Sequence, residues 1–165
     1  MSELNKQTAM TSGIAENLPK MDTTIRVDRS VCPVYPKWAK VVMHPELETV
    51  GPAEYDLAQV ELYLHDGQNS KWMWGTALYE HLKETHSLKN CLGLHDALKI
   101  EKKDIKVFRK LFKDKVVFCW KSVVRGDSNG LFVPYVEGDG HVVVVCWRWL
   151  GNAWSNRSPA ARFAS

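Results

Sequence analysis

The sequence predicts an α+β fold in which helices from the N-terminal and central parts pack on a C-terminal, three-stranded antiparallel β-meander. Apolar residues recur at helical spacing in the central part, and after residue 116 the pattern changes to short runs of β-branched and aromatic residues. The length of 165 residues is usual for one domain, with 45% hydrophobic and 25% charged residues. We therefore expect a single domain over residues 25–155, between a flexible leader (1–24) and a C-terminal tail (156–165).

The leader is expected to be flexible because residues 1–24 are rich in Ser, Thr, Asn and Lys and show no apolar periodicity. Either Met1 or Met21 could be the start of the protein. The N-terminus lacks the apolar segment of a secretory signal, and no stretch approaches the ~20 apolar residues of a membrane helix. We expect a cytoplasmic protein with no membrane partner.

The first elements of the domain are predicted from proline and glycine positions. Pro36 can occupy the first turn of a short helix through Trp38 and Val42, which Pro45 would end. Helix and strand signals compete between residues 51 and 67. The alternation of Val60, Leu62 and Leu64 with polar residues favours a strand over residues 58–64.

The central part is predicted to be helical after a loop at residues 66–70. Thr76 can cap a helix whose apolar face contains Leu78 and Leu82. A second helical region covers residues 94–112, and Asp104 can cap a new helix there and divide the region in two.

Three strands are then expected, at residues 116–120, 131–136 and 141–150. Pro134 would lie in the middle strand of a simple meander, although proline is usually confined to edges or bulges. Because the last strand is apolar on both faces, both sides of the sheet should be covered by helices, the N-terminal arm or a second subunit.

Several short segments also resemble a group of short, single-domain proteins predicted from genomes of candidate-phylum bacteria. These segments are residues 61–68, 78–83, 91–94, 108–110, 120–124, 133–135 and 149–151. The resemblance covers about residues 23–165 and implies one bacterial domain that starts near Met21. Those proteins have no assigned activity, so the resemblance implies no catalytic residue, ligand or cofactor.

The strongest charge feature is a basic stretch from Lys99 to Lys115. The overall net charge of +3 is mild, so an electrostatic function must rest on such a local cluster. Basic side chains on one face of a helix can follow a phosphate backbone, and Trp147 and Trp149 would add stacking surface if exposed. The alternative is a solvated helix face. The candidate nucleic-acid-binding residues are Lys103, Lys106, Arg109, Lys110, Lys113 and Arg148.

A metal-dependent phosphohydrolase is the alternative that would make the protein an enzyme. His65-Asp66 and His95-Asp96 have the residue types that hold metal ions in such enzymes, and other histidines could complete the set. The required helical context is missing at His65, however, which precedes Gly67 and ends a predicted strand. Cys119 and Cys146 lie in apolar strand patterns, so Cys91, at a predicted helix boundary, is the candidate nucleophile, although no local motif supports it.

We therefore predict a non-enzymatic binding or interaction module with no cofactor, whose partner is nucleic acid or another protein. The doubly apolar last strand (residues 141–150) also allows a third class, a self-associating structural protein that would form a homodimer.

Overall fold

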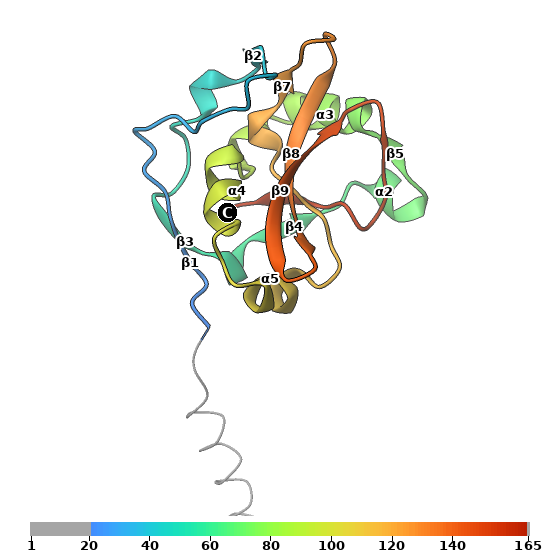
Figure 1. Cartoon of the computed structure of the whole chain (residues 1–165). Helices are drawn as coiled ribbons and strands as arrows, with labels where there is room; N and C mark the ends of the chain where they lie inside the picture. The colour runs from blue at the N-terminus through green and yellow to red at the C-terminus, as the bar shows by residue number, and fades with distance from the viewer. Residues whose placement is uncertain (1–20, 165) are drawn as a thin grey trace, which may run out of the picture.

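A computed structural model describes residues 21–164 as a mixed α/β fold around a curled sheet (Figure 1). The leader prediction for residues 1–20 lies outside the described residues. The α-helices are α2 (Asp66–Ser70), α3 (Gly75–Glu84), α4 (Leu94–Ile100) and α5 (Ile105–Phe112), and the 3-10 turns are η1 (Pro45–Leu47), η2 (Leu57–Gln59), η3 (Leu88–Asn90) and η4 (Trp120–Ser122). The strands are β1 (Thr24–Arg26), β2 (Val41–Val42), β3 (Glu54–Asp56), β4 (Glu61–Tyr63), β5 (Met73–Trp74), β6 (Val117–Phe118), β7 (Val124–Arg125), β8 (Leu131–Asp139), β9 (Val142–Trp149), β10 (Ala153–Trp154) and β11 (Ala160–Arg162).

The main sheet has seven strands rather than the three expected, in the order β2-β7-β8-β6-β11-β4, with β9 paired to β8. β8 lies against β7 and β6 along one edge and against β9 along the other, all antiparallel. Pro134 fits there because β7 pairs with residues 131–132 and β6 with residues 135–136, while η4 separates the two strands. The Pro134 carbonyl still accepts a hydrogen bond from the Cys119 amide. Proline therefore costs the strand only the hydrogen bond that a backbone N–H at residue 134 would donate.

Both faces of the sheet are covered, as the apolar pattern predicted. One face packs Val117, Val136 and Ala161 against β1, α4 and α5. The other packs Phe118, Val133 and Ala160 against α3 and Trp154. Neighbouring residues of one strand therefore enter different cores, because side chains alternate between the faces of a strand. The described chain therefore forms three layers, in which the sheet lies between α4 and α5 on one face and α3 on the other.

The structure confirms that the helical region predicted at residues 94–112 divides at Asp104, whose carboxylate accepts a bond from the amide of Lys106 at the start of α5. The helix predicted through Trp38 and Val42 is wrong, because Val41–Val42 forms β2 and pairs with β7. The loop predicted at residues 66–70 is α2, and α3 begins at Gly75 rather than after a Thr76 cap.

The C-terminal segment differs from the predicted tail. Residues 160–162 form β11, which lies inside the sheet between β6 and β4. Phe163 packs edge-on against Tyr55, with ring centroids 4.9 Å apart. β9, by contrast, pairs only with β8 among the described strands, and the carboxylate of Glu101 accepts a bond from the Val145 amide. The self-association expected from this strand stays a prediction.

A buried ion pair fastens the N-terminal arm to α4. The guanidinium of Arg29 donates two bonds to the Asp96 carboxylate, at 2.9 and 3.2 Å, and also bonds to the carbonyl of Pro52. Asp96 accepts further bonds from the Tyr55 hydroxyl and the Gly93 amide. The carboxylate is thus fully paired, as a buried charge must be. No described helix has the length and apolar character to cross a membrane.

Candidate nucleic-acid interface

Helix α5 separates apolar and basic residues onto two faces. Val107, Phe108 and Phe112 are buried against the sheet, while Lys106 and Lys110 are exposed, together with Arg109 and the C-capping Lys113. The basic residues recur at spacings of three and four, which places them on neighbouring turns of one helix face. Four of the six predicted binding residues therefore form one surface, which we call the α5 surface (Lys106, Arg109, Lys110 and Lys113).

The α5 surface continues into a cleft of 540 Å³ between the end of α5, β8 and the segment before β11. Its walls hold more basic than acidic side chains. They consist of Arg109, Lys113, Asp114, Lys115, Val116, Glu137, Gly138 and Arg157. Lys115 and Arg157 were not among the predicted residues. Arg157 in particular lies far from α5 in the sequence, so no local pattern could have placed it there.

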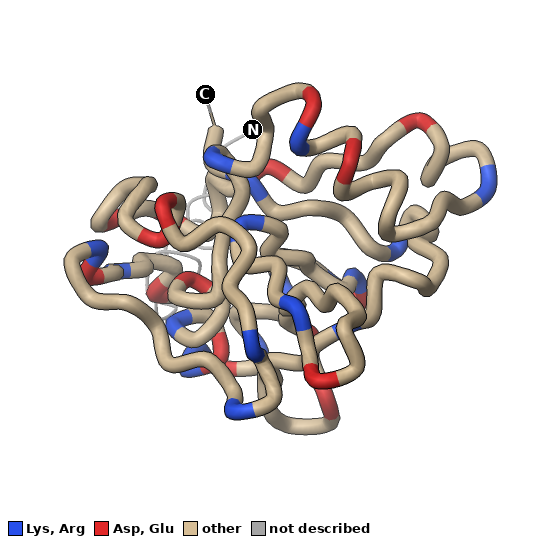
Figure 2. The backbone as a smooth tube through the Cα atoms, turned by 90° about the horizontal axis from the view of Figure 1, so that it is seen from above, with Lys and Arg blue, Asp and Glu red and all other residues tan. Residues whose placement is uncertain are grey.

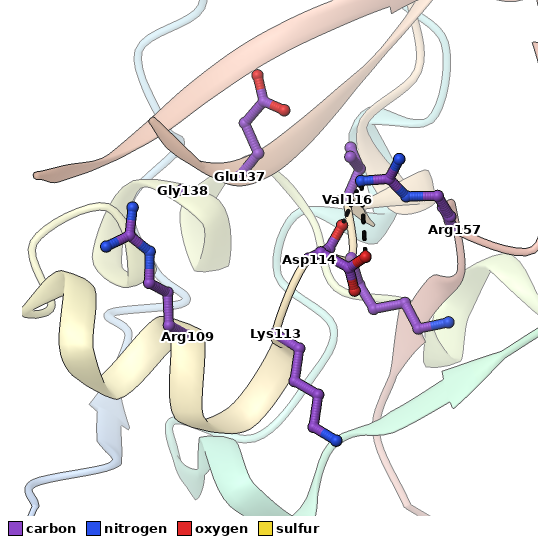
Figure 3. A pocket seen from close by; sticks show the side chains of 8 residues that line it. Arg109, Lys113, Asp114, Val116, Glu137, Gly138 and Arg157 are labelled. Atoms are coloured by element: carbon purple, nitrogen blue, oxygen red, sulfur yellow. Dashed lines mark hydrogen bonds and ion pairs between the residues drawn. The ribbon is translucent and has the colours of Figure 1, made fainter. Parts of the chain in front are cut away.

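The arginines lie on opposite sides of the cleft, with Glu137 above the space between them (Figure 3). Arg109 is tied to the hairpin between β8 and β9 by a hydrogen bond to the Gly140 carbonyl. Arg157 donates to the carbonyl of Asp114 at 3.2 Å and lies 3.7 Å from its carboxylate. Both guanidinium groups are thus held by backbone carbonyls, which do not neutralise their charge. Arg157 also has the Asp114 carboxylate as a partner, whereas Arg109 has none among the described residues.

The chain leaves α5 in an unusual conformation that turns it into the cleft. Lys113 has a φ of 52°, in the region that non-glycine residues seldom adopt, and its amide still bonds to the Arg109 carbonyl. Lys115 follows, and its ammonium bonds to the Asn156 carbonyl at 3.2 Å. Residues 113–115 are therefore linked to the segment that carries Arg157.

Lys103 contributes a second, smaller basic hollow at the other end of α5. It lines a 170 Å³ depression with Arg26, Lys99 and Lys102. The ammonium of Lys103 lies 3.5 Å from the Asp22 carboxylate, and the pKa of Asp22 is lowered by a bond from the Thr24 amide and by this lysine. Basic side chains thus occur before, along and after α5.

Arg148 does not join the α5 surface. Its guanidinium lies 5.1 Å from the ring centroid of Trp154 and 5.9 Å from that of Phe118, on the sheet face that packs α3. It pairs across the strands with Val133, which belongs to the same core. The sequence could not separate Arg148 from the other basic residues, because the face it occupies depends on strand register.

Basic residues elsewhere are mixed with acidic ones. Figure 2 shows Lys and Arg positions interspersed with Asp and Glu along the backbone, in keeping with the small net charge of +3. A general attraction to polyanions therefore does not follow from the overall charge, and the α5 surface and its cleft carry the argument.

An aromatic pocket of 340 Å³ lies at the opposite end of β8 and β9. Trp38 meets Phe132 and Trp147 edge-on, with centroid distances of 5.1 and 5.2 Å. Gly126 lies close beside them, since an added Cβ would be 3.0 Å from the Phe132 ring. Trp149, which follows Trp147 closely in the sequence, is 51% exposed to solvent. The predicted stacking surface of Trp147 and Trp149 is thus partly open to ligands.

The residues proposed for metal binding do not gather into one site in the described part of the chain. His65 caps α2, and its Nδ1 accepts a bond from the Gly67 amide at 2.9 Å, while Asp66 is exposed in the first turn. His81 contacts the His65 ring edge-on and lies 3.1 Å from the Tyr63 hydroxyl. Within residues 21–164, no group of three or more His, Cys, Asp or Glu side chains is arranged to hold a metal ion.

The other catalytic candidates are Asp96 with His95, and Cys91. Asp96 is held in an ion pair, and Cys91 is buried in the core. Asp96 is occupied by Arg29, so it does not act with His95. Burial raises the pKa of the Cys91 thiol to about 12, which keeps it protonated near neutral pH and therefore a poor nucleophile.

Comparison with known proteins assigns this chain to no family. The chain matches no protein-family model, and neither the curated proteins nor the solved structures with which it was compared include a match.

Proposed function

We propose that the protein binds single-stranded nucleic acid, with the phosphate backbone lying along the α5 surface and entering the adjoining cleft. The observation that carries this proposal is the convergence of Arg109, Lys113, Lys115 and Arg157 on one 540 Å³ cleft. Lysine and arginine side chains bind phosphates by charge and by hydrogen bonds, and arginine does so with two parallel bonds. With a volume of 540 Å³, the cleft has room for a backbone phosphate.

The aromatic pocket supports a single strand over a duplex. Unpaired bases stack on aromatic side chains, whereas the faces of paired bases are covered by their neighbours. Phe132 and Gly138 mark the pocket and the cleft at the two ends of β8. Their separation is about 20 Å at ~3.3 Å per residue, within the reach of the roughly 4–16 nucleotides that one single-strand-binding domain contacts.

The test is fluorescence anisotropy of a labelled 12-nucleotide single-stranded RNA with the full chain at several salt concentrations. We expect affinity that falls with salt and binding to the single strand that is tighter than to a duplex of the same sequence. The double variant Lys106→Gln/Lys110→Gln should bind more weakly. Its slope of log affinity against log salt should be smaller by about 1.4, since each phosphate contact to a single strand contributes ~0.7.

A matched control is Lys83→Gln/Lys89→Gln, which removes the same charge from α3 and η3 on the other side of the sheet. This control should keep the affinity and salt slope of the unaltered protein. Absence of salt-dependent binding, or an equal loss in both double variants, would show that the α5 surface is only a solvated helix face.

A further inference from the structure

A second pocket, which we call the α3 pocket, lies away from α5 and has different chemistry. Its volume is 340 Å³, and its floor consists of Leu47, Leu82 and Leu88. Leu82 and Leu88 are almost fully buried, at 1% and 5% exposure, so the floor is part of the core that packs α3. Ligand pockets of roughly 300–1,000 Å³ are mostly apolar with a few placed polar groups, and this pocket lies at the small end of that range.

The rim of the α3 pocket is basic. Lys83, Lys89, His44 and His86 complete its lining, which includes no acidic side chain from the described part of the chain. Lys89 and His86 are exposed and make no ion pair among the described residues. Lys83 lies 2.8 Å from Glu80, a carboxylate of α3 outside the lining. The Lys89 charge is therefore available to an anion in the pocket, whereas Lys83 would share its charge between that anion and Glu80.

One wall of the pocket is held in a fixed orientation. The Nε2 atom of His44 lies 2.5 Å from the hydroxyl of Tyr79, and its Nδ1 lies 3.7 Å from Glu46. Tyr79 is itself buried and stacks on Trp120. The ammonium of Lys83 lies 4.5 Å from the centroid of the Tyr79 ring. Tyr79 therefore contacts both Lys83 of the rim and His44 of this wall. A preformed wall lowers the entropy lost when a ligand binds.

We propose that the α3 pocket binds a small amphipathic carboxylate, with its apolar body on the leucine floor and its carboxylate between Lys83 and Lys89. The apolar floor provides the hydrophobic contribution, and the lysines provide charge complementarity. An uncharged apolar ligand would bury the same surface without satisfying the rim. A short carboxylate would satisfy the rim without covering the floor.

The proposal is tested by isothermal titration calorimetry of the full chain with octanoate, 1-octanol and acetate, the octanoate kept below the concentration at which it forms micelles. We expect octanoate to bind saturably with one site, 1-octanol to bind roughly tenfold more weakly, and acetate not to bind. Lys83→Gln/Lys89→Gln should weaken octanoate roughly 3- to 30-fold, as the loss of two partly exposed ion pairs implies.

The matched control is Lys106→Gln/Lys110→Gln, which removes two exposed lysines of α5 and should leave octanoate affinity unchanged. Both double variants alter side chains at the surface, and circular dichroism checks that they fold. The proposal is overturned if octanoate does not bind, if 1-octanol binds as tightly, or if the α5 variant weakens octanoate as much as the α3 variant. RNA and octanoate binding depend on different lysines, so either proposal can fail alone.

Discussion

The ion pair between Arg29 and Asp96 should be the polar interaction whose loss destabilises the protein most. The Asp96 side chain is completely buried and that of Arg29 is 10% exposed. Asp96→Asn keeps the size of the side chain and removes its charge, which leaves the guanidinium buried without a charged partner, although its bonds to the Pro52 carbonyl remain. Removing one member of a buried pair costs about 3–5 kcal/mol, whereas an exposed pair contributes about 0–1 kcal/mol.

Asp114→Asn is the matched control, because Asp114 also pairs with an arginine but both side chains are more than half exposed. Urea unfolding followed by tryptophan fluorescence would give both free energies. A loss of 3–5 kcal/mol corresponds to a fall in Tm of roughly 6–20 °C for a chain of this size. If Asp96→Asn costs less than about 1 kcal/mol, or no more than Asp114→Asn, the arm is not fastened by this pair.

Three further changes test other parts of the fold. Burial lowers the pKa of Lys121 below its ordinary 10.5, so the unfolded state binds the proton more tightly and stability should rise with pH up to about 10.5. Urea titrations at several pH values should show this rise weakened in Lys121→Met. Gly75→Ala should cost about 1–3 kcal/mol, because its Cβ would lie 2.3 Å from the Trp154 ring, while an unchanged Tm would contradict that packing. Asp104→Ala removes the cap of α5 and should cost about 1 kcal/mol, and circular dichroism should show reduced helix content unless the cap is dispensable.

The sequence was sufficient for elements whose signals are local. Asp104 and the spacing of Ile105, Phe108, Leu111 and Phe112 predicted where α5 begins and that Phe108 and Phe112 face the core, since caps and periodicity act within one or two turns. The long strands β8 and β9 were similarly visible in runs of β-branched and aromatic residues.

Several short strands were missed because they have no pattern of their own, although β4 and β6 lie within the strands predicted at residues 58–64 and 116–120. Val41 and Val42 form β2 only because β7 offers a partner, and Pro36 alone predicted a helix there. Residues 160–162 form β11 between two strands that are distant in the sequence, and two alanines carry almost no strand propensity. These elements are decided by tertiary pairing.

The candidate site shows the same division between local and long-range information. Lys106, Lys110 and Lys113 could be assigned to one helix face from spacing alone, whereas the opposite wall of the cleft needs Arg157, which bonds to the Asp114 carbonyl. A buried glutamine explains how it does so: the Nε2 of Gln68 donates to the carbonyls of Ser155 and Ser158, at 3.0 and 2.9 Å. These bonds fix the chain on both sides of Arg157. The basic character of the surface was therefore encoded locally by α5, whereas its shape depends on a polar contact between α2 and a segment nearly ninety residues away.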